Sequence, residues 1–89
     1  MTKTQQQPDR MVHAVVASEE FNWTCEFVRY DRAGKWYFEE DRNGRNIRTV
    51  MSVSDAAEHF IALRKSGGLT TTHYGGRRGG AAFDRLVKS

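Results

Sequence analysis

The stretch that decides the fold is Trp36-Tyr37-Phe38-Glu39-Glu40-Asp41-Arg42-Asn43-Gly44-Arg45-Asn46-Ile47-Arg48-Thr49-Val50-Met51. The Asn43-Gly44 pair at its centre suits a two-residue type I′ turn, because both central residues of that turn need positive φ. Counting outward from the turn pairs Glu39 with Arg48. The hairpin then has this charge pair on one face and an apolar face made of Trp36, Phe38, Thr49 and Met51.

A further strand is expected before this hairpin. Residues 21–30 alternate apolar and polar side chains, starting with Phe21. Asp31–Gly34 predicts a turn into residues 36–41, and two registers remain open. Pairing Tyr30 with Lys35 sets Phe27 opposite Phe38, which we prefer because the aromatic rings then meet; a bulged turn moves Phe27 to the other face. With residues 46–51, these strands form a three-stranded antiparallel meander.

A helix is expected directly after the meander. Ser52 is its predicted N-cap, Asp55 occupies the capping-box position, and Gly67 is a natural stop. Its apolar residues recur at helical spacing, so we expect them to pack on the aromatic face of the sheet. They are Val53, Ala56, Ala57, Phe60, Ile61 and Leu63.

The two ends of the chain have weaker patterns. Residues 69–74 favour a fourth strand with no assignable partner, residues 75–80 a flexible loop, and residues 81–88 a short helix. Residues 11–17 fit a strand or a short helical turn, and residues 1–10 are typical of a disordered leader. The prediction is one small α+β domain over residues 11–89: a three-stranded antiparallel meander packed on one helix, with a fourth strand and a short C-terminal helix.

Composition excludes several classes of protein. The chain has 89 residues, room for one domain, and its apolar runs are far shorter than the ~20 residues of a membrane span. The polar N-terminus lacks the apolar stretch of a secretory signal, so we expect a cytoplasmic protein with no membrane partner. Cys25 is the only cysteine, which excludes an internal disulfide and a cysteine zinc site, and we expect it to be a buried apolar residue.

Charge is distributed unevenly along the chain. Residues 1–60 have 8 basic and 10 acidic side chains, a balance of −2, whereas residues 61–89 have 6 basic and 1 acidic, a balance of +5. Arg77 and Arg78 stand between two Gly-Gly pairs, where guanidinium and backbone N–H groups suit a phosphate. The other basic residues of this third are Arg64, Lys65, Arg85 and Lys88. The competing interpretation is a solvated mobile loop.

A second basic cluster lies on the Asn-Gly hairpin. Arg45 and Arg48 belong to it with Arg42, but the acidic run 39–41 precedes them, which favours local ion pairing. With Arg48 beside it on the open sheet face, Tyr37 offers a surface for a base or a partner protein.

Nothing in the sequence indicates catalysis. His13, His59 and His73 fall in three different elements without metal-ligand spacing, and each is expected to be exposed or hydrogen-bonded. Nucleophile, Walker and dinucleotide motifs are missing. We therefore expect a protein that is not an enzyme and has no cofactor or metal.

Within residues 21–65, the order of elements is set by Lys35-Trp36-Tyr37-Phe38, the Asn43-Gly44 turn, residues 47–51 and Ser54-Asp55-Ala56-Ala57-Glu58. This stretch resembles the three-strand-then-helix layout of AP2-type and integrase-arm DNA-binding domains. The resemblance implies a sheet laid in the DNA major groove, with Arg29, Arg45 and Arg48 as contacts. This chain departs from that pattern in its acidic run 39–41.

The leading hypothesis is a small non-enzymatic module that binds DNA or RNA through residues 61–89. The alternative is an accessory or inhibitor protein of a phage or mobile element that binds a host protein through the open sheet face. A third possibility is a subunit that forms a homodimer through a sheet edge.

Overall fold

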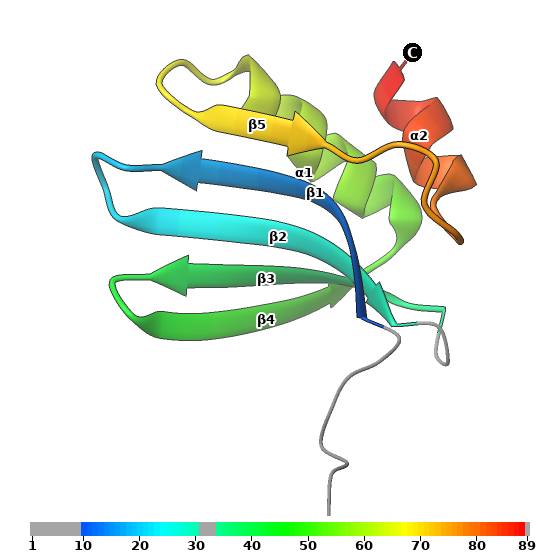
Figure 1. The fold of residues 1–89 in the computed structure, drawn as a ribbon, viewed down its shortest axis with the longest axis horizontal. Helices are drawn as coiled ribbons and strands as arrows, with labels where there is room; N and C mark the ends of the chain where they lie inside the picture. The colour runs from blue at the N-terminus through cyan, green and yellow to red at the C-terminus, as the bar shows by residue number, and fades with distance from the viewer. Residues whose placement is uncertain (1–9, 31–33, 89) are drawn as a thin grey trace, which may run out of the picture.

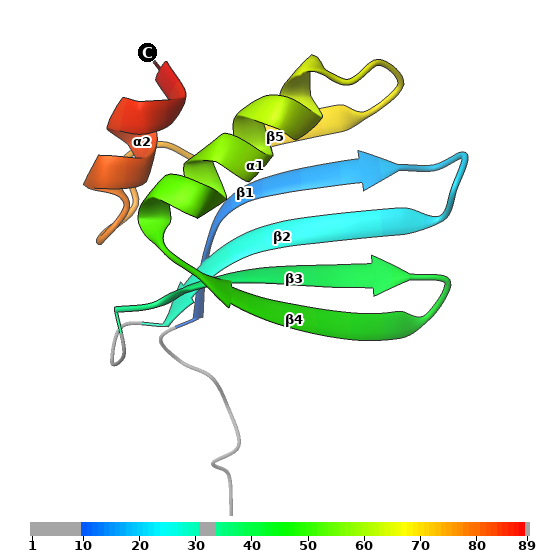
Figure 2. The same ribbon diagram turned by 180° about the vertical axis from the view of Figure 1, so that it is seen from behind.

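The computed structural model describes residues 10–30 and 34–88, which form two layers. A five-stranded antiparallel sheet has the order β4-β3-β2-β1-β5, and two helices cover one of its faces (Figures 1 and 2). The elements are β1 (Arg10–Ser18), β2 (Trp23–Tyr30), β3 (Trp36–Arg42), β4 (Arg45–Met51), α1 (Val53–Lys65), β5 (Thr70–His73) and α2 (Ala81–Lys88). The α+β class is therefore confirmed.

The meander has the predicted registers. Phe27 pairs with Phe38 across β2 and β3, and Glu39 pairs with Arg48 across β3 and β4. The turn between β3 and β4 places Asn43 at φ 52° and Gly44 at φ 87°, as a type I′ turn requires. Of the expected turn at 31–34, only Gly34 lies within the described residues.

The sheet is larger than predicted. Residues 11–17, for which two interpretations were open, belong to β1, so the meander has four strands rather than three. The strand expected at 69–74 is β5, and it pairs with β1, with Val16 opposite Thr71. The expected leader lies outside the described residues except for Arg10, which begins β1. The first strand was ambiguous because its apolar residues do not alternate, and the register shift between Val12 and Ala14 explains why.

The prediction that Phe21 is part of a half-buried strand is wrong. Phe21 lies in the turn between β1 and β2, and its side chain is 69% exposed. Asn22 adopts a left-handed conformation, φ 49°, so the chain reverses there and β2 starts only at Trp23. The Asn22 carbonyl accepts from the backbone N–H of Asn43 at 3.1 Å, which ties the two hairpin turns together.

Helix α1 lies on the aromatic face of the sheet, as its apolar stripe predicted. Ser52 is the N-cap and its hydroxyl accepts from the Asp55 N–H at 3.1 Å. Phe60 is buried and meets Phe27 edge to face, with ring centroids 5.8 Å apart. Of the predicted stripe, Ala56, Ala57 and Phe60 are buried, and the others are partly buried at the margin of the core.

Helix α2 closes the core at the end of the sheet that carries Trp36. Phe83 is fully buried and stacks on Trp36, with ring centroids 4.8 Å apart and planes 20° apart. Both Phe83 and Val87 lie on its buried face, and the helix packs against α1. The expected short C-terminal helix is therefore present, and it brings the C-terminal end of the chain beside α1 and β5 (Figure 1).

Candidate functional site

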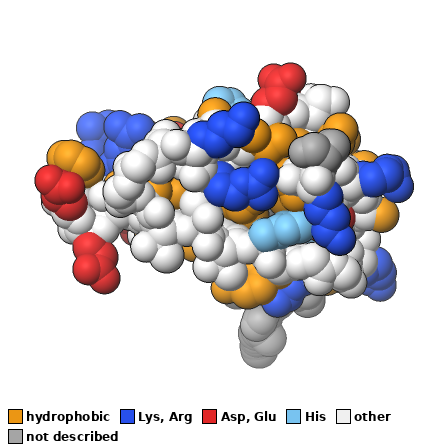
Figure 3. Space-filling model, turned by 90° about the horizontal axis from the view of Figure 1, so that it is seen from above, with side chains coloured by type: hydrophobic (Ala, Val, Ile, Leu, Met, Phe, Trp, Pro, Cys, Tyr) orange, Lys and Arg blue, Asp and Glu red, His pale blue; other side chains and the backbone are white. Residues whose placement is uncertain are grey.

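The exposed basic side chains of residues 61–89 come from α1, α2 and the segment between β5 and α2. Figure 3, which looks at the molecule from the β5 edge, shows Lys and Arg side chains spread over this side, with few acidic groups among them. We call this the C-terminal basic surface, and it consists of Arg64, Lys65, Arg77, Arg78, Arg85 and Lys88. The elements that carry these side chains, α1, α2 and the segment between β5 and α2, lie at the β5 side of the molecule (Figure 1).

Arg64 is held in place by uncharged groups. It lies in the last turn of α1, and its Nη2 donates to the backbone carbonyl of Val87 in α2 at 3.1 Å. Its guanidinium also lies over the ring of Phe60, 5.5 Å from the centroid. Neither partner carries a negative charge, so these contacts orient the guanidinium without neutralising it.

Arg77 is positioned in the same way. Its guanidinium lies 4.9 Å from the centroid of the Tyr74 ring, a cation–π contact at the exposed surface. Its backbone carbonyl accepts from the Gly80 N–H at 3.0 Å. Gly76 and Gly79 have φ near +82° and +83°, conformations that favour glycine, so the two glycine pairs define the path of this segment.

Asp84 is the only acidic residue of the C-terminal third, and it faces inward. Its Oδ1 lies 2.8 Å from His73 Nε2, and its Oδ2 accepts from the Gly76 N–H at 3.0 Å. Burial raises the pKa of this carboxyl, but the hydrogen bonds from Gly76 and His73 outweigh it and the net pKa is lowered. Asp84 therefore anchors the segment that carries Arg77.

Two residues from the sheet lie beneath this segment. A Cβ on Gly79 would fall 2.0 Å from Arg29 Nη1, and one on Gly80 would fall 2.5 Å from His13 Nδ1. Arg29 is therefore a neighbour of the basic surface, which the sequence did not indicate because 50 positions separate it from Gly79. The resemblance to DNA-binding sheets placed Arg29 among the groove contacts, whereas here it lies on the helix side.

His13 is buried, contrary to the expectation that each histidine would be exposed or hydrogen-bonded. It is 0% exposed, and neither ring nitrogen has a hydrogen-bond partner among the described residues. Burial and the nearby Arg29 and Arg77 lower its pKa from 6.5 to about 4. His13 is therefore neutral at pH 7.

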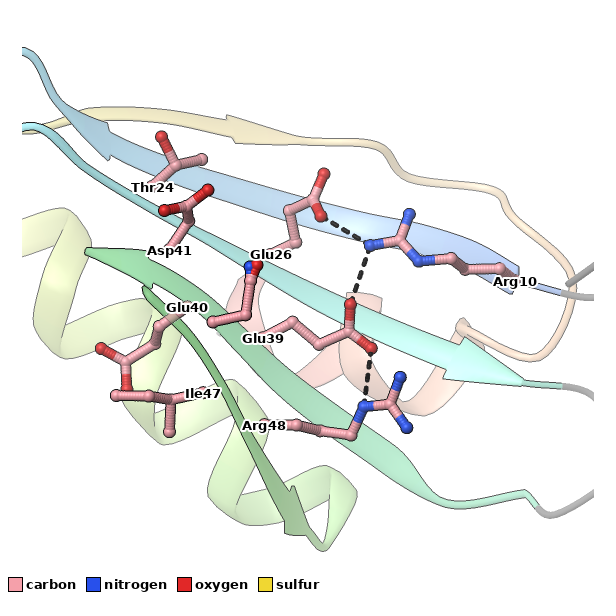
Figure 4. Close-up of a pocket in the computed structure, with 9 residues that line it drawn as sticks. Arg10, Thr24, Glu26, Glu39, Glu40, Asp41, Ile47 and Arg48 are labelled. Carbon is pink, nitrogen blue, oxygen red and sulfur yellow. Dashed lines mark hydrogen bonds and ion pairs between the residues drawn. The ribbon is translucent and has the colours of Figure 1, made fainter. Parts of the chain in front are cut away.

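The opposite, open face of the sheet has a closed charge network centred on Glu39 (Figure 4). Arg10 Nη2 bridges Glu26 Oε1 at 2.6 Å and Glu39 Oε1 at 2.9 Å. Glu39 Oε2 accepts from the Tyr30 hydroxyl at 2.6 Å and pairs with Arg48 Nε at 3.2 Å. We call these five residues the open-face network; it confirms the predicted Glu39–Arg48 pair.

The pKa values of the network show how its members stabilise one another. Burial raises the pKa of Glu39, but hydrogen bonds from Tyr30 and Arg10 outweigh burial and lower it overall. Burial and the hydrogen bond to Glu39 raise the pKa of Tyr30. Burial opposes the charge of Arg10, yet its bonds to Glu39, Glu26 and Tyr30 raise its pKa. Each charge here is matched by a neighbour.

A shallow cavity of about 500 Å³ lies over the network. Figure 4 shows its two ends: the guanidinium groups of Arg10 and Arg48 lie on one side of Glu39, and Asp41 and Glu40 lie on the other. Tyr37 lies beside Arg48, whose guanidinium is 5.3 Å from the Tyr37 ring centroid.

The two groups of predicted binding residues are therefore separate. Arg45, Arg48 and Tyr37 lie on β3 and β4, whereas the C-terminal basic surface lies at the β5 side, across the full width of the sheet. Arg48 is engaged by Glu39, and Arg42 Nε pairs with Glu40 at 3.0 Å, so local ion pairing is confirmed for both.

The groups that often support catalysis are dispersed or buried. No cluster of three or more His, Cys, Asp or Glu suited to a metal occurs in residues 10–30 and 34–88. Cys25 is fully buried, as predicted, and burial raises the pKa of its thiol. Neither of the described helices is long and apolar enough to cross a membrane.

Comparison of the chain with protein-family models, curated proteins and solved structures gave no match.

Proposed function

We propose that the chain is a non-enzymatic module that binds DNA or RNA through the C-terminal basic surface. The observation that carries the proposal is that two arginines of this surface are held by uncharged groups. Arg64 and Arg77 are oriented by a carbonyl and by aromatic rings, which leave their charge available to a phosphate. The nearby carboxylate of Asp84 is engaged by His73 and Gly76.

The arrangement of the surface supports backbone contacts rather than base reading. Its side chains are long and exposed, and the glycine-rich segment allows close approach of a phosphate to the main chain. Tyr74 is the exposed aromatic residue on this side, and Arg77 lies over its ring. We therefore expect an affinity that depends strongly on salt and weakly on sequence.

The test is a binding titration with a labelled DNA duplex and a labelled single-stranded RNA. Six phosphate contacts predict a loss of roughly a thousandfold in affinity between about 50 and 200 mM salt. The variant Arg77→Ala/Arg78→Ala weakens binding by roughly tenfold and lowers the salt slope by about 2.

The matched control removes two arginines from the β3–β4 hairpin, on the side of the sheet away from β5. Arg42→Ala/Arg45→Ala leaves affinity within about twofold if the basic surface makes the contacts. If this control loses affinity instead, the sheet enters the groove, as the likeness to AP2-type domains implies. Salt-insensitive binding to a protein, with no shift of either nucleic acid, replaces the proposal with the protein-binding alternative.

A further inference from the structure

A bulge in β1 directs His13 into the core. The register between β1 and β2 shifts between Val12 and Ala14, which leaves His13 as the extra residue. Its ring therefore lies on the helix side, with its centroid 4.6 Å from that of Trp36. The imidazole is 0% exposed, and neither nitrogen has a hydrogen-bond partner among the described residues. Because a buried polar group without a partner costs free energy, its presence points to a role beyond packing.

The ring of His13 faces the N-terminal end of α2. The Gly80 carbonyl accepts from the Asp84 N–H at 2.8 Å, which is the first hydrogen bond of the helix, so Gly80 is the N-cap. A Cβ on Gly80 would fall 2.5 Å from His13 Nδ1 and 2.7 Å from its Cε1. This edge of the imidazole is therefore directed at the N-cap, and glycine there allows the close approach.

The first turn of α2 has N–H donors to offer. Ala81, Ala82 and Phe83 follow the N-cap, and their N–H groups have no hydrogen-bond partner among residues 10–30 and 34–88. The carboxylate of Asp84 is bonded elsewhere, to His73 and to the Gly76 N–H. Free N–H groups at the positive end of a helix dipole attract an anion.

Arg29 adds a full positive charge beside this turn. Its guanidinium packs against Gly79, where a Cβ would fall 2.6 Å from Cζ. Arg29 has no hydrogen bond or ion pair within the part of the chain that the structure describes. A guanidinium without a carboxylate partner and a row of free N–H groups are the donors that a phosphate takes.

We propose that the first turn of α2, with Arg29 beside it and His13 beneath it, binds a phosphate group. The N–H groups and the guanidinium donate to the phosphate oxygens. His13 is fully buried, so it acts through charge: the bound anion favours its imidazolium form, and protonation in turn favours the anion. The phosphate belongs to a small ester or to a nucleic acid, and the site does not depend on the wider basic surface.

The experiment titrates inorganic phosphate into the isotope-labelled full chain at pH 7, with ionic strength held constant by sodium chloride, and follows the amide signals by NMR. We expect saturable shifts that are largest at Ala81, Ala82 and Phe83. Shifts that do not saturate, or that are spread evenly over the C-terminal basic surface, overturn the proposal.

Two pairs of variants locate the contacts. Arg29→Gln weakens phosphate binding by at least about tenfold, because a charge-assisted hydrogen bond is lost. Arg45→Gln, on the strand farthest from β5, leaves affinity within about twofold. Ala81→Pro suits the first helical position but removes one N–H donor, so binding falls about three- to fivefold, whereas Ala81→Ser retains it. Equal affinity of the two Ala81 variants overturns the proposal even if Arg29→Gln fails to fold.

The role of His13 is tested with sulfate, whose charge stays constant over the titration. Arg29, Arg77 and His73 oppose protonation of the imidazole. Asp84 favours it, and a bound anion adds to that effect, so saturating sulfate raises the pKa of His13. Sulfate therefore binds more tightly as pH falls, and His13→Leu reduces this dependence. A pKa of His13 that sulfate leaves unchanged contradicts its place in the site.

The last measurement identifies the source of the phosphate. A short single-stranded RNA that ends in a phosphate, and the same strand that ends in a hydroxyl, are added to the phosphate-saturated chain. Displacement by the first strand alone assigns a terminal phosphate, displacement by both assigns the RNA backbone, and displacement by neither assigns a small ester. A chain that binds no RNA still responds to inorganic phosphate, so this proposal and the proposed function fail separately.

Discussion

The two faces of the molecule hold their arginines in different ways. On the open face, Arg10 and Arg48 are held by carboxylates: Arg10 forms ion pairs with Glu26 and Glu39, and Arg48 forms one with Glu39. On the β5 side, Arg64 and Arg77 are held by the carbonyl of Val87 and by aromatic rings. The two arginines of the open face therefore produce little net electrostatic field, because carboxylates neutralise them. The two arginines on the β5 side produce a positive field.

This difference teaches that charge counting along a sequence is not enough to locate a binding surface. A carboxylate partner orients an arginine and neutralises it, whereas a neutral partner only orients it. Burial lowers the pKa of His13, and the nearby Arg29 and Arg77 lower it further. The predictions below test the two faces separately.

The largest expected effect is an acid-sensitive loss of stability that originates beneath the basic surface. The pKa of His13 is lowered from 6.5 to about 4, so the unfolded chain takes up a proton before the folded chain does. The contribution of His13 to the free energy of unfolding therefore falls as pH drops from about 6.5 to 4, by on the order of 2–3 kcal/mol, and is constant above that window. Arg29, Arg77 and His73 oppose protonation of His13, and Asp84 favours it.

His13→Leu is the variant that isolates this effect. It replaces a buried ring with unpaired nitrogens by an apolar side chain, so we expect equal or greater stability at pH 7 and a flat profile from pH 6.5 to 4.5. Urea unfolding at a series of pH values measures both. A variant that retains the wild-type slope would show that other groups cause the acid sensitivity.

The second effect is on the open face. Glu39→Gln removes the charge that Arg10, Tyr30 and Arg48 share, and since the Glu39 side chain is only 19% exposed we expect a loss of about 1–2 kcal/mol at pH 7. The pKa of Glu39 is lowered, so its contribution is present above its ordinary value of 4.5 and is lost as pH falls below it. The difference in the free energy of unfolding between the wild type and Glu39→Gln therefore becomes smaller below pH 4.5.

Asp41→Asn is the matched control for this prediction. Asp41 lies on the same strand and face, but it is exposed and its Oδ1 accepts from the Gly44 N–H at 3.1 Å. We expect a change below about 0.5 kcal/mol. Equal losses in the two variants would mean that Glu39 is not the centre of the network.

The parts of the fold that could be predicted depend on local signals. The Asn43-Gly44 turn determines the β3–β4 register through backbone conformation alone, and Ser52 with its apolar stripe determines α1. Phe21 was placed wrongly because an alternating pattern contains no sign of the left-handed Asn22 that ends the turn. The strand identity of β1 depended on pairing with β2 and β5, which are contacts between distant residues.

The candidate site could also be predicted only in part. The basic excess of residues 61–89 is visible in the sequence, but the partners of each charge are not. Arg10 reaches Glu39 across 29 positions, and Arg64 reaches Val87 across 23. Which arginines are neutralised is therefore a property of the tertiary structure.

The smallest expected effect comes from giving one arginine of the basic surface a carboxylate partner, as the arginines of the open face have. Tyr74→Glu places a carboxylate where the ring now orients Arg77, so we expect nucleic-acid affinity to fall about three- to fivefold and the salt slope to fall by about 1. Tyr74→Gln removes the ring without adding charge, and its salt slope stays at the wild-type value. Identical slopes for the two variants would show that the charge of Arg77 does not reach a phosphate, because only the glutamate variant neutralises that charge.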